Sequence, residues 1–437
     1  MAASCTKVAP LYSLKTPANG PDTTRDIRKM LDSLPGSSLF TQAFKRAGLN
    51  GKLDPAAFYT LFVPSDSAMQ AAGLTSDVIN TLSPDSLSFW LSYHITLGGI
   101  SDTTLTNAVV SLQQNCLLET LYYSPLGTVS PGYSSFRHSL FVKEYGGKLN
   151  INGWTVNGGE RPVAASNGYI YPIHILLRPP SATIWDILQS RPELSYYLAA
   201  IRIIDSIYVP LAQYDQPAYT DSTVFSQLRF DQVYGAQPVY VPPVHATVFA
   251  PTNTAFIQAG LPDIDSIRNY ILGSMRTDTL RYDPNQPWNN VFNTIPGFGY
   301  EILPNGGASG IINYLPFDSV LKMQYLFNVN QQSLTGQSPD LSFSNSLCYS
   351  DLTGSPSINN GVLNVCTLNA SFQKVASITP YTLRFSSGAG GQLTIQWNAA
   401  GSGNAVIPQD ANQLQRARNF WALNGVIYES DQLFLYQ

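Results

Sequence analysis

The chain carries one strand–proline–helix pattern twice, and this repeat constrains the fold more than any other feature. The two copies span Tyr59–Met69 and His245–Phe256. Each begins with β-branched and aromatic residues typical of a buried strand, and a proline then ends the strand because it has no N–H for a sheet hydrogen bond. The Ser or Thr after the proline is a favoured helix N-cap residue. We therefore predict that the 437 residues form two domains built on the same element.

A second repeated pattern follows each copy further along the chain. Asn167 and Asn424 each precede a glycine and an apolar run, and the first run predicts the last strand of domain 1 over 169–177. The two patterns together resemble the two signatures of the fasciclin domain. The resemblance implies an α+β fold of two tandem fasciclin-like domains, each a β-sandwich or wedge with helices packed at one edge. That family usually has His and Asp where this chain has Tyr171 and His174, so any buried hydrogen bond there must be made differently.

The spacing of the two patterns indicates that the second copy is enlarged. Phe62 and Asn167 are 105 residues apart, whereas Phe249 and Asn424 are 175 residues apart. Long loops in a compact domain are usually functional or disordered. We assign residues 1–24 to an N-terminal tether, 25–180 to domain 1, and 181–437 to domain 2, with insertions near 207–244 and 281–400.

The second insertion sets aromatic rings among Asn, Gln and Ser residues. Such surfaces bind sugars or proteins, because a ring stacks on an apolar face while amides bond to hydroxyls. Alternatively, the rings pack the insertion onto its own domain, since aromatic side chains bury large areas wherever they lie. The candidate binding residues are Tyr282, Trp288, Phe298, Tyr300 and Tyr314.

Tyr93 and His94 form a further candidate binding pair in domain 1. A Tyr-His pair on the central helix is a feature of the fasciclin family, and the resemblance links it to adhesion. The alternative is that Tyr93 packs in the core and His94 satisfies a local carbonyl group. An isolated His with no carboxylate or second His nearby in sequence is seldom a ligand, which favours the packing alternative.

The N-terminal residues Met1–Lys7 resemble the end of a bacterial lipoprotein signal, in which small residues precede the cysteine that receives the lipid. The resemblance implies a lipid anchor on Cys5, by which the protein would be held in the outer membrane of a bacterial envelope and exposed at the cell surface. The alternative is that Cys5 is a thiol on a frayed tail. No apolar run approaches the roughly 18 to 20 residues of a membrane-spanning helix.

Three further cysteines lie in the predicted domains. Cys348 and Cys366 share one polar stretch, and a disulfide between them would contribute about 3 kcal/mol on the chain-entropy model. Two reduced thiols are the alternative. Cys116 is most simply a small core residue.

Composition and motifs argue against several classes of function. The net charge is −4, and the Lys and Arg residues are scattered, so nucleic acid is not an expected partner. We find no zinc-binding His pattern, phosphate-binding glycine loop, nucleophile elbow or Cys-x-x-Cys pair. Asp263 and Asp265 form an acidic pair in what looks like a helix-capping segment before Ile267, where the helix dipole stabilises negative charge, so they need no acid/base role. We therefore expect no enzymatic activity, no metal and no cofactor.

These observations favour a non-enzymatic envelope lipoprotein that binds a glycan or a partner protein. We expect an accessory role in an outer-membrane nutrient-uptake complex, with the transporter or another envelope protein as partner. One alternative is a general cell-adhesion or matrix protein that uses the ordinary fasciclin surfaces. An enzyme is the third, least favoured alternative.

Overall fold

The computed structural model divides into two compact units. Unit 1 comprises residues 1–120 and 137–179, and unit 2 comprises 121–136 and 180–437. Within these units, the structure describes residues 24–108, 111–124, 132–203, 246–273, 325–326, 346–354, 363–364, 382–398, 403–407 and 419–433.

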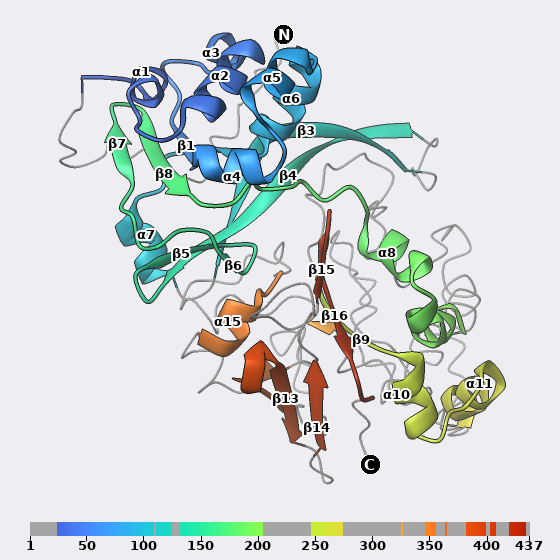
Figure 1. Cartoon of the computed structure of the whole chain (residues 1–437). Coiled ribbons are helices and arrows are strands. Elements are labelled where there is room, and N and C mark those ends of the chain that lie inside the picture. Colours follow the sequence, from blue (N-terminus) through green and yellow to red (C-terminus); the bar gives the residue numbers. More distant parts are fainter. Residues whose placement is uncertain are drawn as a thin grey trace, which may run out of the picture. The chain divides into compact units, whose positions relative to one another are not determined.

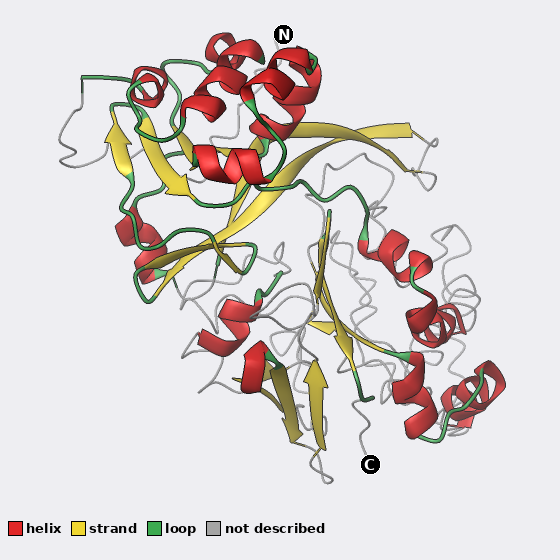
Figure 2. Ribbon diagram, in the orientation of Figure 1, coloured by secondary structure: helices red, strands yellow, loops and turns green. Residues whose placement is uncertain are grey.

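Unit 1 places most of its helices at one edge of a long sheet (Figures 1 and 2). The helices are α1 (Ile27–Asp32), α2 (Ser38–Arg46), α3 (Leu49–Lys52), α4 (Asp66–Ala71), α5 (Ser76–Thr81), α6 (Pro84–Ser92) and α7 (Asp102–Asn107). The strands are β1 (Tyr59–Pro64), β2 (Ile95–Leu97), β3 (Leu112–Ser124), β4 (Gly132–Tyr145), β5 (Lys148–Ile151), β6 (Trp154–Thr155), β7 (Val163–Ala165) and β8 (Gly168–Ile173). Residues 121–124 of β3 and 132–136 of β4 are counted with unit 2.

Strand β1 lies between the two hydrophobic clusters of unit 1, so both of its faces are buried. All six of its residues are buried. Leu61 and Val63 belong to the hydrophobic cluster formed with α1–α6, whereas Phe62 belongs to a second cluster with side chains of β3, β4 and β5. This double burial explains why the strand has a continuous apolar sequence rather than an alternating one.

The sheet order is β6-β5-β4-β3-β2-β1-β8-β7. β1 pairs in parallel with β8 and antiparallel with β2. The predicted mixed fold with helices at one edge is confirmed. The predicted end of the last strand was too late: β8 ends at Ile173, and the backbone N–H of Leu177 donates to a histidine ring instead of a sheet neighbour.

Unit 2 repeats the central strands of unit 1. Its helices are α8 (Ile184–Ser190), the 3-10 turn η1 (Pro192–Leu194), helical residues 195–203, α10 (Asn253–Gln258), α11 (Ile264–Gly273), α15 (Tyr349–Gly354) and the 3-10 turn η4 (Ala389–Gly391). Its strands are β9 (Ala246–Pro251), β10 (Tyr325–Leu326), β11 (Leu363–Asn364), β12 (Thr382–Ser387), β13 (Leu393–Asn398), β14 (Gly403–Ile407), β15 (Asn419–Ala422) and β16 (Gly425–Ser430). They form two sheets, ordered β10-β9-β16-β15 and β11-β12-β13-β14.

The two strand–proline–helix patterns adopt the same conformation in both units. β9 pairs in parallel with β16, as β1 does with β8. Ser65 and Thr252 are the N-caps of α4 and α10, and each side chain accepts a hydrogen bond from the backbone N–H three residues on. An aromatic contact repeats as well, because the ring centroids of Phe62 and Tyr171 lie 5.6 Å apart and those of Phe249 and Tyr428 lie 5.5 Å apart.

Long-range hydrogen bonds from backbone N–H groups to side-chain oxygens also repeat. Asn167 Oδ1 accepts from Ile27 N at 2.8 Å, and Asn424 Oδ1 accepts from Ile184 N at the same distance. Asp66 Oδ1 accepts from Leu39 N, and Asn253 Oδ1 accepts from Tyr196 N. Thr60 Oγ1 accepts from Ile100 N, and Thr247 Oγ1 accepts from Leu347 N. Since these bonds join distant segments, their repetition shows that the two units share one tertiary fold.

These bonds also locate the additional residues of unit 2. Leu39 and Asp66 are 27 positions apart, whereas Tyr196 and Asn253 are 57 apart. The step from Thr60 to Ile100 is 40 residues, and its counterpart from Thr247 to Leu347 is 100. The step from Ile100 to Tyr171 is 71 residues, and that from Leu347 to Tyr428 is 81. Most of the added length therefore precedes Leu347.

The C-terminal part of the predicted insertion near 281–400 contains elements that have counterparts in unit 1. Leu347 is the counterpart of Ile100, and α15 begins two residues after Leu347, as α7 begins two residues after Ile100. β12 and β13 form an antiparallel pair, and Phe385 of β12 packs against Phe249. In unit 1, β4 and β5 form the corresponding pair, and their side chains pack with Phe62. Residues from 347 onward therefore contain elements of the repeated fold.

Candidate functional site

The candidate pair Tyr93 and His94 lies in the core of unit 1. Their relative exposures are 1% and 0%. His94 Nε2 accepts from Leu177 N at 3.0 Å, so its Nδ1 carries the proton and donates to Trp90 O at 3.1 Å. The Tyr93 hydroxyl accepts from Asn152 Nδ2 at 3.0 Å. This geometry corresponds to the packing alternative, and neither side chain lies on the surface. Any effect of these residues on adhesion would act through the fold.

We expect the stability of unit 1 to fall as the pH falls from about 6.5 towards 4. Burial lowers the pKa of His94 to about 4. An unfolded chain takes up this proton near pH 6.5, so protons stabilise the unfolded state in that interval. The stabilisation is complete above pH 6.5 and is lost towards pH 4, by about 3 kcal/mol for one imidazole. Urea unfolding at pH 7, 5 and 4, followed by hydrogen exchange in β1, measures this loss.

The matched variant is His94→Gln, which removes this titration. It should be less stable than the wild-type at pH 7, and its stability should depend less on pH. Burial also lowers the pKa of His138 to about 4, so part of the dependence should persist in the variant. Equal pH dependence in the two proteins would contradict the assignment of His94 as a buried neutral group.

Most of the other candidate residues lie outside the described part of the chain. They are Cys5, Tyr282, Trp288, Phe298, Tyr300, Tyr314 and Cys366. Cys348 is buried, and its disulfide with Cys366 stays a prediction. Cys116 is a fully buried thiol in the second core cluster of unit 1, which confirms its expected packing role.

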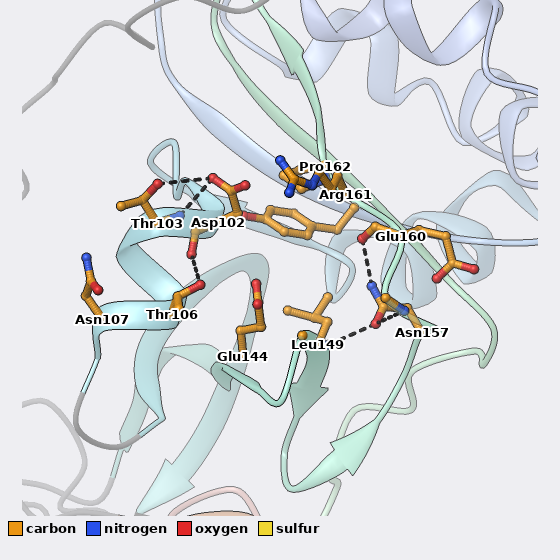
Figure 3. Close-up of a pocket in the computed structure, with 13 residues that line it drawn as sticks. Asp102, Thr103, Thr106, Asn107, Glu144, Leu149, Asn157, Glu160, Arg161 and Pro162 are labelled. Atoms are coloured by element: carbon orange, nitrogen blue, oxygen red, sulfur yellow. Dashed lines mark hydrogen bonds between the residues drawn. The ribbon is translucent and has the colours of Figure 1, made fainter.

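Unit 1 also contains a polar pocket of about 350 Å³, shown in Figure 3. Helix α7 forms one side, the β4–β5 hairpin forms another, and residues 157–162 form a third, with Tyr171 of β8 contributing to the wall. The lining residues are Asp102, Thr103, Thr106, Asn107, Glu144, Gly147, Leu149, Asn157, Gly159, Glu160, Arg161, Pro162 and Tyr171.

Local sequence explains the position of each wall. Ser101 caps α7 by accepting from Thr104 N, which fixes the first helical turn and the carboxylate of Asp102 beside it. Asn157 holds its loop in place, because its Oδ1 accepts from Leu149 N at 2.8 Å and its Nδ2 donates to Glu160 O at 3.1 Å. The pocket is therefore built on hydrogen-bonded backbone.

The pocket carries more negative than positive charge. Asp102 Oδ1 accepts from Thr103 N at 2.8 Å, and the side-chain carboxylate of Glu144 has no hydrogen-bond partner among the described residues. The Glu160 carboxylate is turned away from these two acids in Figure 3, and it pairs with His174 Nε2 at 3.1 Å. Arg161 is the one basic residue among those that line the pocket.

Two pKa values in the pocket reflect these surroundings. Hydrogen bonds from its own backbone N–H and from Gly158 N, together with the nearby His174, hold the pKa of Glu160 below its usual range. Burial, and then the negative charge of Asp102, raise the pKa of Tyr171. Tyr171 thus remains a neutral donor, and its hydroxyl bonds to Ile100 O at 2.9 Å. This bond is how domain 1 accommodates Tyr at a position where fasciclin domains usually have His.

Sequence reasoning missed this pocket. Its residues come from four separate segments between Asp102 and Tyr171, and none of them forms a motif. The signals available were the capping sequence from Ser101 to Thr104 and the Asn157-Gly158-Gly159 turn. Neither indicates that the two segments meet.

No group of three or more His, Cys, Asp or Glu side chains in the described ranges is placed to hold a metal ion. None of the described helices is long and apolar enough to cross a membrane.

Comparison with known proteins identifies the first copy of the repeat. Residues 35–179 match the family model of the fasciclin domain. Comparison with curated proteins gives no match. Among solved structures, the chain is similar to a FAS1 domain pair from the insect cell adhesion molecule fasciclin I, with 12% identity, 92% of this chain and 97% of that chain covered, and a TM-score of 0.28.

Residues 35–179, most of which lie in unit 1, thus match the fasciclin domain. Unit 2 shares its fold by the repeated strands and hydrogen bonds within the chain itself. Fasciclin domains are typically non-catalytic domains of adhesion and binding.

Proposed function

We propose that this chain is a non-enzymatic binding protein of the bacterial cell envelope that captures a glycan or a partner protein. It is held to the outer membrane through a lipid on Cys5, and it assists a transporter or another envelope protein in nutrient uptake. A fasciclin domain in unit 1 supports a binding role in general. The proposed capture of a glycan or a partner protein depends on the enlargement of the second copy.

The observation that carries the proposal is the unequal length of two otherwise equivalent units. From Thr60 to Ile100 the chain takes 40 residues, and from Thr247 to Leu347 it takes 100 to join the same two structural positions. Added length of this kind is usually functional or disordered, and the aromatic residues interleaved in it favour a function. The five candidate aromatic residues, from Tyr282 to Tyr314, all lie in this added length.

A substitution variant tests this proposal without deleting elements of the fold. Deleting 281–400 would remove α15, β12 and β13, so we prefer the fivefold change of Tyr282, Trp288, Phe298, Tyr300 and Tyr314 to Ser. The matched control changes five residues of the other insertion to Ser: Tyr208, Tyr214, Tyr219, Tyr234 and Tyr240.

We expect the first variant to lose at least tenfold in its capture of envelope glycans or proteins, because Trp and Tyr are enriched among the few contact residues whose loss costs about 2 kcal/mol or more. The control should retain capture. Binding is measured by crosslinking in intact envelopes and by glycan-array titration. Unchanged capture by the first variant would favour the alternative of a general adhesion protein that uses the ordinary fasciclin surfaces.

A further inference from the structure

We propose that the pocket of unit 1 is a binding site for a small amino sugar, either free or at the end of a glycan. The inference rests on the proposed binding function and adds a second, separate site to it. It places recognition of one sugar unit in unit 1, apart from the aromatic residues of the unit 2 insertion.

The size and wall of the pocket match a small polar ligand. Its volume of about 350 Å³ is at the lower end of the range for ligand pockets. The hydroxyls of Thr103 and Thr106 on α7 donate to Asp102 and can accept hydrogen bonds from ligand hydroxyls. Asn107 adds an amide group, and Pro162 offers an apolar surface to a ring face. The mixture fits a hydroxylated ring better than a hydrophobic ligand.

The charges of the pocket favour a cationic sugar over an acidic one, because three acids, Asp102, Glu144 and Glu160, outnumber Arg161 in its lining. Asp102 and Glu144 approach it from α7 and β4, and Figure 3 shows both carboxylates in the space between these elements. Glu144 has its hydrogen-bonding capacity available, as the structure gives it no partner among the described residues. A carboxylate in this position accepts strong hydrogen bonds from an ammonium group and repels an anion. An amino sugar supplies both an ammonium group and the hydroxyl groups.

The second copy of the fold lacks these two acids. Tyr349 begins α15 at the position where Asp102 begins α7. Ser387 occupies the place of Glu144, since Ser387 pairs with Leu393 on the adjacent strand as Glu144 pairs with Leu149. The Tyr349 ring is partly buried, and a side-chain hydrogen bond joins it to Ser387. The acidic pocket is therefore a property of unit 1 and not a requirement of the repeated fold.

Ligand-observed NMR titration of the full chain tests the proposal with four probes. Glucosamine, glucose and glucuronate share one ring and differ in charge, and Nα-acetyl-lysinamide carries an ammonium group without a sugar. We expect affinity to fall from glucosamine to glucose, and glucuronate to show no binding. Best binding by glucuronate, equal binding of lysinamide and glucosamine, or no binding of any sugar would overturn the proposal.

Three variants localise the binding. Glu144→Gln should weaken glucosamine about tenfold, the usual effect of losing a hydrogen bond to a charged group. Asp102→Tyr introduces the side chain of unit 2 and should abolish binding by filling the pocket. Glu119→Gln changes an exposed acid on β3 outside the pocket and should bind as the wild-type does. Unchanged glucosamine affinity in both pocket variants, with their folding verified by thermal unfolding, would overturn the assignment.

This test is independent of the proposed capture by unit 2. If the pocket variants lose glucosamine while capture by the aromatic residues is unaffected, the two sites are distinct. If the fivefold aromatic variant captures its ligand as the wild-type does, the proposed function of unit 2 fails. The pocket proposal is then still decided by the sugar titrations.

Discussion

Replacing Gly168 with Ala is expected to unfold unit 1. Gly168 has φ of +149°, where side chains other than hydrogen are strained, and a Cβ added there would overlap the carbonyl oxygen of Tyr59. Tyr59 is the register partner of Gly168 at the start of the parallel pairing of β1 with β8. Because relief would require separating these central strands, we expect a loss of more than about 3 kcal/mol in the free energy of unfolding. Urea unfolding with hydrogen exchange of β1 amides measures it.

Two other glycines provide the matched comparison. Gly425 has φ of +152° at the equivalent start of β16, so Gly425→Ala should unfold unit 2 in the same way. Gly51 lies within helix α3 with open space around its missing side chain, so Gly51→Ala should be neutral or slightly stabilising. A Gly168→Ala protein as stable as the Gly51→Ala protein would show that β1 and β8 do not pair as described.

Arg191→Leu is expected to destabilise unit 2 by about 3 to 5 kcal/mol, the usual cost of removing one partner of a buried ion pair. Arg191 Nε donates to Glu429 Oε1 at 2.9 Å, and the Glu429 side chain is only 2% exposed. The guanidinium also lies 3.9 Å from the centre of the Phe420 ring. The substitution removes the positive charge that faces a carboxylate buried on β16.

The double variant Arg191→Leu with Glu429→Val separates loss of the ion pair from loss of packing. In unit 1, Leu34 occupies the position that corresponds to Arg191, and Pro172 occupies the position that corresponds to Glu429. The fold therefore accepts apolar residues at both positions. We expect the double variant to be more stable than Arg191→Leu alone, since no buried carboxylate remains. Additive losses in a double-mutant cycle, measured by urea unfolding, would contradict direct pairing of the two side chains.

The sequence predicted the repeated core because local chemistry determines it. The continuous apolar runs, the prolines at Pro64 and Pro251 and the caps at Ser65 and Thr252 each act within a few residues, and all occur where the structure places them. The Asn-Gly pairs had an additional role that sequence did not reveal. Asn167 and Asn424 each accept from a backbone N–H on the first helix of their unit, at sequence separations of 140 and 240 residues.

The candidate sites were harder to predict because they depend on which distant segments meet. Tyr93 and His94 form a recognisable pair, but their burial follows from packing against β1 and the chain near Leu177. Helix α7 is short and was not predicted, and nothing in the sequence indicated that it meets the turn at Asn157 to form a pocket. The boundary of the second insertion also depended on a tertiary contact, the bond from Leu347 N to Thr247.

Native-state hydrogen exchange of the full chain by NMR tests the central claim, that one fold occurs twice, most directly. The informative amides are those of Ile27, Leu39 and Ile100 in unit 1 and of Ile184, Tyr196 and Leu347 in unit 2. We predict that the three amides of each unit exchange only when that unit unfolds as a whole. Exchange of Ile184, Tyr196 and Leu347 at the rates of an unstructured chain, while their unit 1 counterparts stay protected, would contradict the duplication.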